Sequence, residues 1–411
     1  MSQPDPFGGL FGGDPGDLAG ALRKMADLLQ GAGQGGPVDW GLASNMARQT
    51  VAGDDPSPGP AEQAAVEAAL RLADLWLDAV TSLPSGVSHA EAWSRAQWIE
   101  ATKDTWRHLT DPVAGRMVEA FTATVPDEAR ASLGPMLGML QQVGGLVFGA
   151  QVGQGVGALA GEVLSASDVG VPLGPSGTAA LLPHSLSRWA ADLSLPIDEV
   201  RLHVALREAA HQRLFVHVPW LRAHLHGAVE AYARGIKVDR EALEQAVQGV
   251  DMSNPEALQE ALAGGLFEPQ DTPEQQSALA RLETGLALVE GWVDHVVAAA
   301  TANRLPSASA QREAQRRRRA TGGPAEQAFG TLVGLELRPR RLREAAELWG
   351  ELTRLRGADG RDAIWEHPDL LPDATDLDDP AGYAERSAPL DLSGLDDAGE
   401  APDEPNGNSS S

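Results

Sequence analysis

The chain has 411 residues, of which 32 are basic, 58 are acidic and none is cysteine, and its formal net charge at pH 7 is −26. The lack of cysteine excludes thiol catalysis, cysteine-ligated zinc and disulfides, and the negative charge opposes general attraction to nucleic acid. Hydrophobic residues make up 43% of the chain, which is enough for a core, and the N-terminus lacks the basic and apolar segments of a signal peptide, so we expect a cytoplasmic protein.

The first 60 residues are rich in glycine and proline. Within them, residues 38–51 predict one short helix, and the flanking segments are typical of flexible joints. We therefore interpret residues 1–60 as a loosely docked N-terminal arm. A helical domain is expected over residues 61–357, and Ser88 with Glu91 predicts a capping box at the start of its second helix.

Between residues 126 and 165, glycine recurs at every fourth position. Glycine costs about 1 kcal/mol in a helix interior, so this stripe predicts a second helix packed at very short distance. Similar stripes occur in pairs of membrane helices, but glutamine and glutamate side chains interrupt the apolar run, so we expect no membrane span. The stripe consists of Gly145, Gly149, Gly153, Gly157 and Gly161.

A central helix is expected after a loop. Residues 169–183 interrupt helical periodicity repeatedly and predict a loop or a short β hairpin. Residues 198–217 then predict about five helical turns, because Asp198 is a good N-cap and Pro219 prevents continuation. Both faces of this helix are apolar, so we expect it to lie at the centre of the fold.

Three ionisable side chains, Arg207, Glu208 and His211, interrupt one apolar face of this helix. A buried charge is costly unless it is paired, bound to metal or facing a cleft, so the trio indicates a functional site. The spacing Arg-Glu-x-x-His resembles the zincin motif His-Glu-x-x-His, in which two histidines hold zinc and the glutamate is the general base. Arg207 departs from the motif because a guanidinium offers no lone pair to a metal.

A second helix, expected over residues 272–304 after a Thr-Pro-Glu-Gln capping box, also carries carboxylates on an apolar stripe. Glu290 and Asp294 resemble the Glu-x-x-x-Asp pair of the gluzincins, whose glutamate is the third zinc ligand and whose aspartate contacts the first histidine. The resemblance implies that Asp294 lies against Arg207 and forms a buried ion pair with it. Glu290 or Glu208 is expected to join this pair, so that a fixed cation replaces the metal.

Other histidines are alternative sources of the missing zinc ligand. A lone histidine on a helix is more often hydrogen-bonded or at the surface, so none of them is favoured on sequence alone. The candidates are His203, His217, His224 and His226.

The C-terminal part of the chain separates its charges. Arginines are concentrated after Pro306, but the net charge of −26 does not favour a nucleic-acid patch there. Residues 358–411 contain 15 acidic and 2 basic residues and predict an acidic, disordered tail. One hypothesis is that this tail contacts the protein's own arginine-rich helices and competes there with an anionic partner.

Five segments together carry a wider family resemblance. They resemble the actinobacterial zincin-like metallopeptidase family, which is related to a branch associated with coenzyme F420 biosynthesis. The resemblance implies a mainly α, multi-helix zincin-like domain. By position, it also implies that Glu208 is the general base, that His211 and Glu290 are zinc ligands, and that position 207 departs from the pattern. The segments lie at residues 38–40, 71–78, 199–215, 272–297 and 334–349.

The expected function is that of a zinc-dependent metallohydrolase, similar to a metallopeptidase, with a degenerate site that is weak or inactive in hydrolysis. Zinc is the cofactor that the resemblance implies, and we expect it to bind weakly or not at all because Arg207 replaces a ligand. The alternative is a noncatalytic cytoplasmic binding or scaffold protein. Its partner is expected to be a peptide or protein that binds the former cleft and the charged tail.

Overall fold

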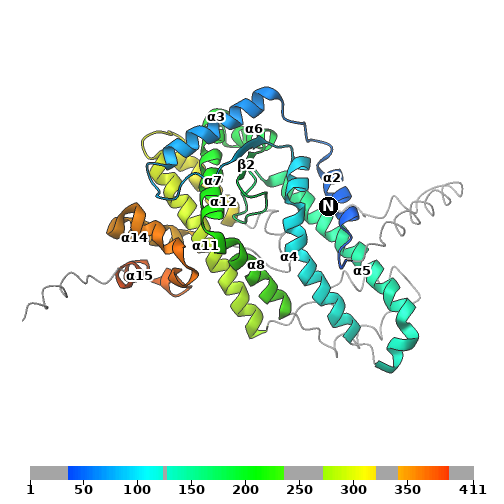
Figure 1. Ribbon diagram of the computed structural model, residues 1–411. Helices are drawn as coiled ribbons and strands as arrows, with labels where there is room; N and C mark the ends of the chain where they lie inside the picture. Colours follow the sequence, from blue (N-terminus) through cyan, green and yellow to red (C-terminus); the bar gives the residue numbers. More distant parts are fainter. Residues whose placement is uncertain (1–35, 124–126, 236–271, 321–340, 388–411) are drawn as a thin grey trace, which may run out of the picture.

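The computed structural model describes residues 36–123, 127–235, 272–320 and 341–387, which are predominantly helical (Figure 1). The predicted mainly α fold class is confirmed. Two short parallel strands form the one sheet of these residues, β1 (His89–Ala92) and β2 (Thr178–Leu181). The helices are α2 (Trp40–Val51), α3 (Pro60–Leu77), α4 (Arg95–Ala123), α5 (Asp127–Glu162), α6 (Pro183–Leu193), α7 (Ile197–His217), α8 (Pro219–Arg234), α11 (Pro273–Thr301), α12 (Ala308–Ala320), α14 (Leu342–Asp362) and α15 (Pro380–Arg386).

Helix α7 lies at the centre of the fold, in contact with α3, α6, α8 and α11 (Figure 1). Every residue from 203 to 215 is buried, and α11 is likewise buried from residue 285 to residue 294. The prediction of a central helix is therefore confirmed, with its start at Ile197, one residue before the expected N-cap. The capping box of α11, formed by Thr272 and Gln275, is also confirmed.

The start of α4 differs from the prediction. Residues 89–92 form β1, and the helix begins only at Arg95. The residues that cap it are Ser94 and Gln97: the N–H of Ser94 donates to Gln97 Oε1 at 2.7 Å, and the N–H of Gln97 donates to Ser94 Oγ at 3.2 Å. The predicted helix start at Ser88 is therefore wrong. Ser88 and Glu91 have the same spacing as the true capping residues Ser94 and Gln97, but Glu91 lies in β1. Strand β2 pairs in parallel with β1, and the segment predicted as a loop or short hairpin is a loop closed by one antiparallel bridge between Ser165 and Leu181.

The glycine stripe of α5 packs directly against α2. A Cβ atom on Gly149 would lie 2.6 Å from the carbonyl oxygen of Asp39, and one on Gly153 would lie 2.6 Å from that of Ala43. On Gly157 the nearest atom would be 2.8 Å away. Close packing of a second helix is therefore confirmed at these three glycines, whereas a Cβ atom on Gly161 would have no neighbour within 4 Å. The interpretation of the predicted short helix as part of a loosely docked arm is wrong.

Gly153→Ala is expected to lower the free energy of unfolding by about 1 to 3 kcal/mol, because the new methyl group must displace the backbone of α2. The matched control is Gly144→Ala in the same helix, where an added Cβ atom has no neighbour within 4 Å. Alanine there is expected to raise the free energy of unfolding by up to about 1 kcal/mol through helix propensity. Chemical denaturation measures both values, and equal effects would contradict close packing of α2 on α5.

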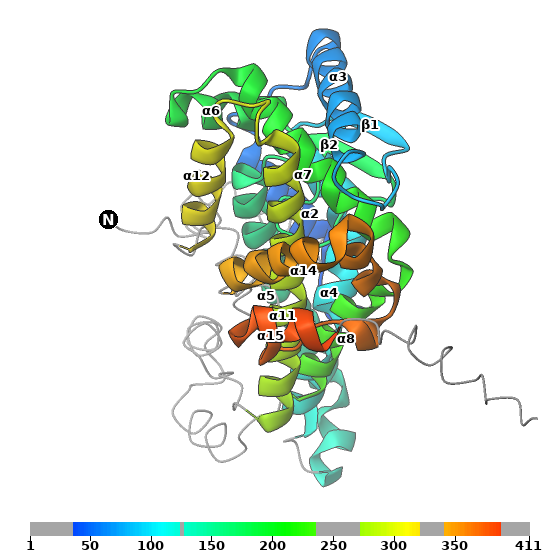
Figure 2. The ribbon, with the colours of Figure 1, turned by 90° about the vertical axis from the view of Figure 1, so that its left-hand side faces the viewer.

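The acidic segment after residue 358 is folded as far as residue 387. Two of its side chains, Trp365 and Leu377, are 2% and 1% exposed and join the hydrophobic core. The prediction of disorder is therefore wrong for residues 358–387, because widely spaced apolar residues anchor an otherwise acidic segment. After α14 the chain forms η1 (Ala363–Glu366), η2 (Pro368–Leu370), η3 (Asp376–Asp378) and α15, and α14 crosses α11 in Figure 2.

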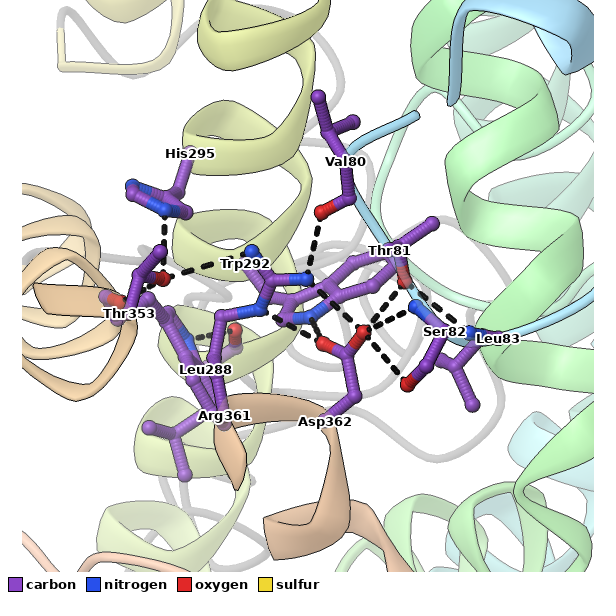
Figure 3. A network of polar contacts seen from close by, with 11 residues as sticks. Val80, Thr81, Ser82, Leu83, Leu288, Trp292, His295, Thr353, Arg361 and Asp362 are labelled. Carbon is purple, nitrogen blue, oxygen red and sulfur yellow. Dashed lines mark hydrogen bonds and ion pairs between the residues drawn. The ribbon is translucent and has the colours of Figure 1, made fainter. Parts of the chain in front are cut away.

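A buried ion pair fixes the C-terminal end of α14 (Figure 3). Arg361 Nε donates to Asp362 Oδ1 at 2.7 Å, and Trp292 Nε1 of α11 donates to the same oxygen at 2.9 Å. The other carboxylate oxygen accepts from Thr81 Oγ1 at 2.6 Å and from the N–H of Ser82 at 2.8 Å. Asp362 therefore joins α14 to α11 and to the segment that follows α3.

Within the described ranges, no helix combines the length and the apolar character that a membrane crossing requires. The predictions for residues 1–35 and for the last part of the acidic tail, residues 388–411, fall outside the described residues. Two of the C-terminal arginines, Arg338 and Arg340, also fall outside them.

Candidate functional site

Helices α7 and α11 bring Arg207, His211 and Glu290 into one buried cluster. Arg207 Nη2 donates to Glu290 Oε2 at 2.6 Å, and His211 Nε2 lies 2.9 Å from Glu290 Oε1. The three residues are 7%, 1% and 1% exposed. The expected ion pair between Arg207 and Glu290 is therefore present. Since a carboxylate oxygen accepts, the hydrogen shared with Glu290 belongs to His211 Nε2.

The loop between α5 and β2, residues 163–177, covers this buried cluster. Gly170 has a φ of +79°, and a Cβ atom there would lie 2.5 Å from Glu290 Oε1. Glycine tolerates both the left-handed backbone and the close approach. Arg222 of α8 holds the loop by donating to the carbonyl oxygen of Pro172 at 2.8 Å. The loop thus closes the cluster from this side.

Glu208 lies in a separate group of hydrogen bonds. Its Oε2 accepts from the N–H of Ser167 at 2.9 Å, and its Oε1 accepts from Ser167 Oγ at 3.2 Å and from Gln212 Nε2 at 3.0 Å. Glu208 is fully buried, and burial raises its pKa, although the charge of His211 and these hydrogen bonds oppose the rise. The contacts of Glu208 therefore tie α7 to the covering loop.

Asp294 lies one helical turn after Glu290 and binds two arginines of α12. Arg312 Nε donates to Oδ1 and to Oδ2 at 2.9 Å, and Arg316 Nη2 donates to Oδ2 at 2.6 Å. Burial alone raises the pKa of Asp294, but the hydrogen bonds and charges of Arg312 and Arg316 bring the pKa below its ordinary value. The expected direct pair between Asp294 and Arg207 is therefore wrong, because α12 supplies two closer cations.

A cavity of about 560 Å³ lies beside the buried cluster, between α7, α11 and α12. Arg207 lines it and thereby links the cavity to Glu290. His203 also lines it, is 3% exposed and has no partner for its Nδ1 among the described residues. Burial, followed by the charge of Arg207, lowers the pKa of His203 to about 3, so its ring is neutral near pH 7.

Of the candidate metal ligands, His211 and Glu290 are the two that a described contact brings together. Among the described residues, no group of three or more histidine, aspartate or glutamate side chains is arranged to hold a metal ion. Of the alternative histidines, His217 Nε2 lies 3.0 Å from the carbonyl oxygen of Ser85, and the ring of His226 lies 4.9 Å from that of His108. No described contact places His217 or His226 beside His211.

Some site residues were missed in the sequence. Gln212 follows Glu208 by four positions, so their contact on one helical face was predictable from spacing. Ser167 gave no comparable signal, since it reaches Glu208 through the shape of a loop. Arg312 and Arg316 belong to the arginine-rich stretch after Pro306, and only the position of α12 shows that they pair with Asp294.

Comparisons with known proteins agree with this architecture. A family profile described as zincin-like metallopeptidase matches residues 38–384. A crystal structure of a protein from Chloroflexus aurantiacus, described as a candidate hydrolase with a novel fold, is similar with a TM-score of 0.59 and 21% identity. The alignment covers 85% of this chain and 98% of that one. The search of curated proteins gave no match.

Proposed function

Because the chain belongs to the zincin-like metallopeptidase family, we propose that it is a degenerate member in which an arginine takes the place of a zinc ligand. The observation that carries this proposal is the contact of 2.6 Å between Arg207 Nη2 and Glu290 Oε2. A guanidinium stays protonated at every relevant pH and offers no lone pair. The cation at position 207 therefore satisfies the carboxylate that zinc would otherwise neutralise.

The donor set of the buried cluster does not fit a zinc site. Structural and catalytic zinc sites use three or four nitrogen, oxygen or sulfur ligands from the protein. Here one imidazole and one carboxylate are available, and both oxygens of Glu290 accept from α7 side chains. His211 and Glu290 are therefore proposed as remnants of a ligand set, and Asp294 as a residue that once supported it and now pairs with α12.

Glu208 is also poorly placed for general base catalysis. A general base must reach the proton that it removes, either directly or through one water. Both oxygens of Glu208 accept from Ser167 and Gln212, and the side chain is fully buried under the covering loop. We infer that Glu208 acts as a structural tether in this chain and not as a catalytic residue.

The test of this proposal is an assay of peptide hydrolysis by the purified chain with added zinc, on a mixture of unfolded peptides. The expected result is no zinc-dependent cleavage above background, with the same background for Glu208→Gln. Cleavage that is removed both by a chelator and by Glu208→Gln would contradict the proposal. Circular dichroism of the variant checks that the comparison is made on folded protein.

The noncatalytic alternative is favoured by one further observation. The cavity of about 560 Å³ beside the buried cluster has the size of a small-molecule site, for which volumes of about 300 to 1,000 Å³ are usual. A chain that has lost its metal chemistry can keep a function in binding. We therefore propose that this cavity, and not the buried cluster, is the surface that contacts a ligand.

A further inference from the structure

The cavity between α7, α11 and α12 has an unusual lining for a protein of net charge −26. General attraction of anions to so acidic a chain is unfavourable, so any anion site must be local. Four of the residues that line the cavity are arginines, and they come from α7, from the segment after α11 and from α12. They are Arg207, Arg304, Arg312 and Arg316.

The carboxylates around the cavity do not neutralise these arginines fully. Arg312 and Arg316 share the single carboxylate of Asp294. Arg304 lies over the ring of Trp76, at 5.4 Å from its centre, and has no carboxylate partner among the described residues. The second acidic residue of the lining, Glu313, pairs with the exposed Arg317 at 3.8 Å. The lining therefore keeps a surplus of positive charge.

Hydrogen-bond donors in the cavity are also not fully used. Arg207 donates through Nη2 to Glu290, and its remaining N–H groups have no partner among the described residues. His203, nearly fully buried and neutral, carries one N–H, and it makes no hydrogen bond within the described ranges. Two polar atoms of the lining, His203 Nδ1 and Arg316 Nε, are buried without a partner among the described residues. Buried polar groups normally have partners, so these atoms indicate a missing partner in the cavity.

We propose that this arginine-lined cavity binds a small organic anion that carries carboxylate or phosphate groups. Guanidinium groups bind both kinds of oxyanion with two parallel hydrogen bonds, and such charge-assisted bonds are about twice as strong as neutral ones. The charge of the lining does not depend on whether the buried cluster holds zinc. The inference therefore rests on the proposed binding function of this cavity and names its class of ligand, whereas the proposed loss of zinc is tested separately by the assay of peptide hydrolysis.

Isothermal titration of the full chain with citrate and with inorganic pyrophosphate tests the proposal. Saturable binding of at least one probe to one site per chain is expected, and the tighter probe distinguishes a carboxylate ligand from a phosphate ligand. Arg304→Gln should weaken this binding by about tenfold or more, the loss typical of one hydrogen bond to a charged group. Arg316→Gln should weaken it similarly, while Arg312 keeps Asp294 paired.

The matched control is Arg354→Gln, because Arg354 is 62% exposed, pairs with Glu351 on α14 and does not line the cavity. The affinity of this control variant for the probe is expected to equal that of the wild type. The proposal is overturned if neither probe binds saturably. It is also overturned if Arg304→Gln and Arg316→Gln bind as tightly as the wild type, or if Arg354→Gln weakens binding as much as they do.

Discussion

Arg207→Met is expected to lower the free energy of unfolding by about 3 to 5 kcal/mol, which is the usual cost of removing one partner from a buried ion pair. Methionine keeps much of the side-chain volume, but it removes the positive charge that Arg207 places against Glu290, which is 1% exposed. His211 remains as a hydrogen-bond partner of Glu290. Urea denaturation of the wild type and the variant measures the loss.

Two control variants separate the ion pair from general damage to α7. Adding Glu290→Gln to Arg207→Met removes the buried carboxylate that has lost the charge of Arg207, so the double variant should be more stable than the single one. Arg201→Met should cost less than about 1 kcal/mol, because Arg201 pairs at 2.7 Å with Asp198, whose side chain is 86% exposed. Equal losses in all three variants would contradict a specific role for Arg207.

Asp362→Asn is expected to have an effect of similar size, a loss of about 3 to 5 kcal/mol in the free energy of unfolding. The substitution keeps the shape of the side chain but leaves the guanidinium of Arg361, which is 1% exposed, without a counter-charge. It also places an amide N–H₂ group where the carboxylate accepts from Thr81 or Trp292. Thermal and urea unfolding of the purified variant measure this loss.

The effect of Asp362 should also depend on pH. Burial alone raises its pKa, but the hydrogen bonds and charge of Arg361 bring the pKa below the ordinary value of 3.8. Its stabilisation is therefore complete above that value and disappears as the pH falls through the lower pKa of the folded state. The control Glu351→Gln removes an exposed pair with Arg354 on the same helix and should cost less than about 1 kcal/mol. If Asp362→Asn also lowered the free energy of unfolding by less than about 1 kcal/mol, that result would contradict the network in Figure 3.

Local sequence rules predicted much of this fold. Capping residues and prolines placed α7 and α11 closely, because helix ends depend on a few neighbouring side chains. The glycine stripe predicted a close helix contact, since only a near backbone explains so many glycines on one face. The same rules misplaced the start of α4, where Ser88 and Glu91 have the spacing of a capping box within a strand.

Partner choice in the site was harder to predict, because it depends on how distant segments meet. The contact between Arg207 and Glu290 followed from burial and from family resemblance. The pairing of Asp294 with Arg312 and Arg316 did not, since the sequence does not show that α12 packs against α11. The acidic composition of residues 358–387 also led to a wrong prediction of disorder. A few apolar residues of this segment pack into the core and hold the segment against α14.

The zinc content of the purified wild-type chain, measured by elemental analysis after exposure to zinc and gel filtration, tests most directly whether Arg207 has replaced the metal. We expect no stoichiometric zinc in the wild type, because the guanidinium of Arg207 already occupies Glu290 Oε2. Arg207→His, which restores a ligand beside His211, provides the comparison and is expected to bind more zinc than the wild type. One zinc ion per wild-type chain that is lost in His211→Ala would contradict the proposed replacement.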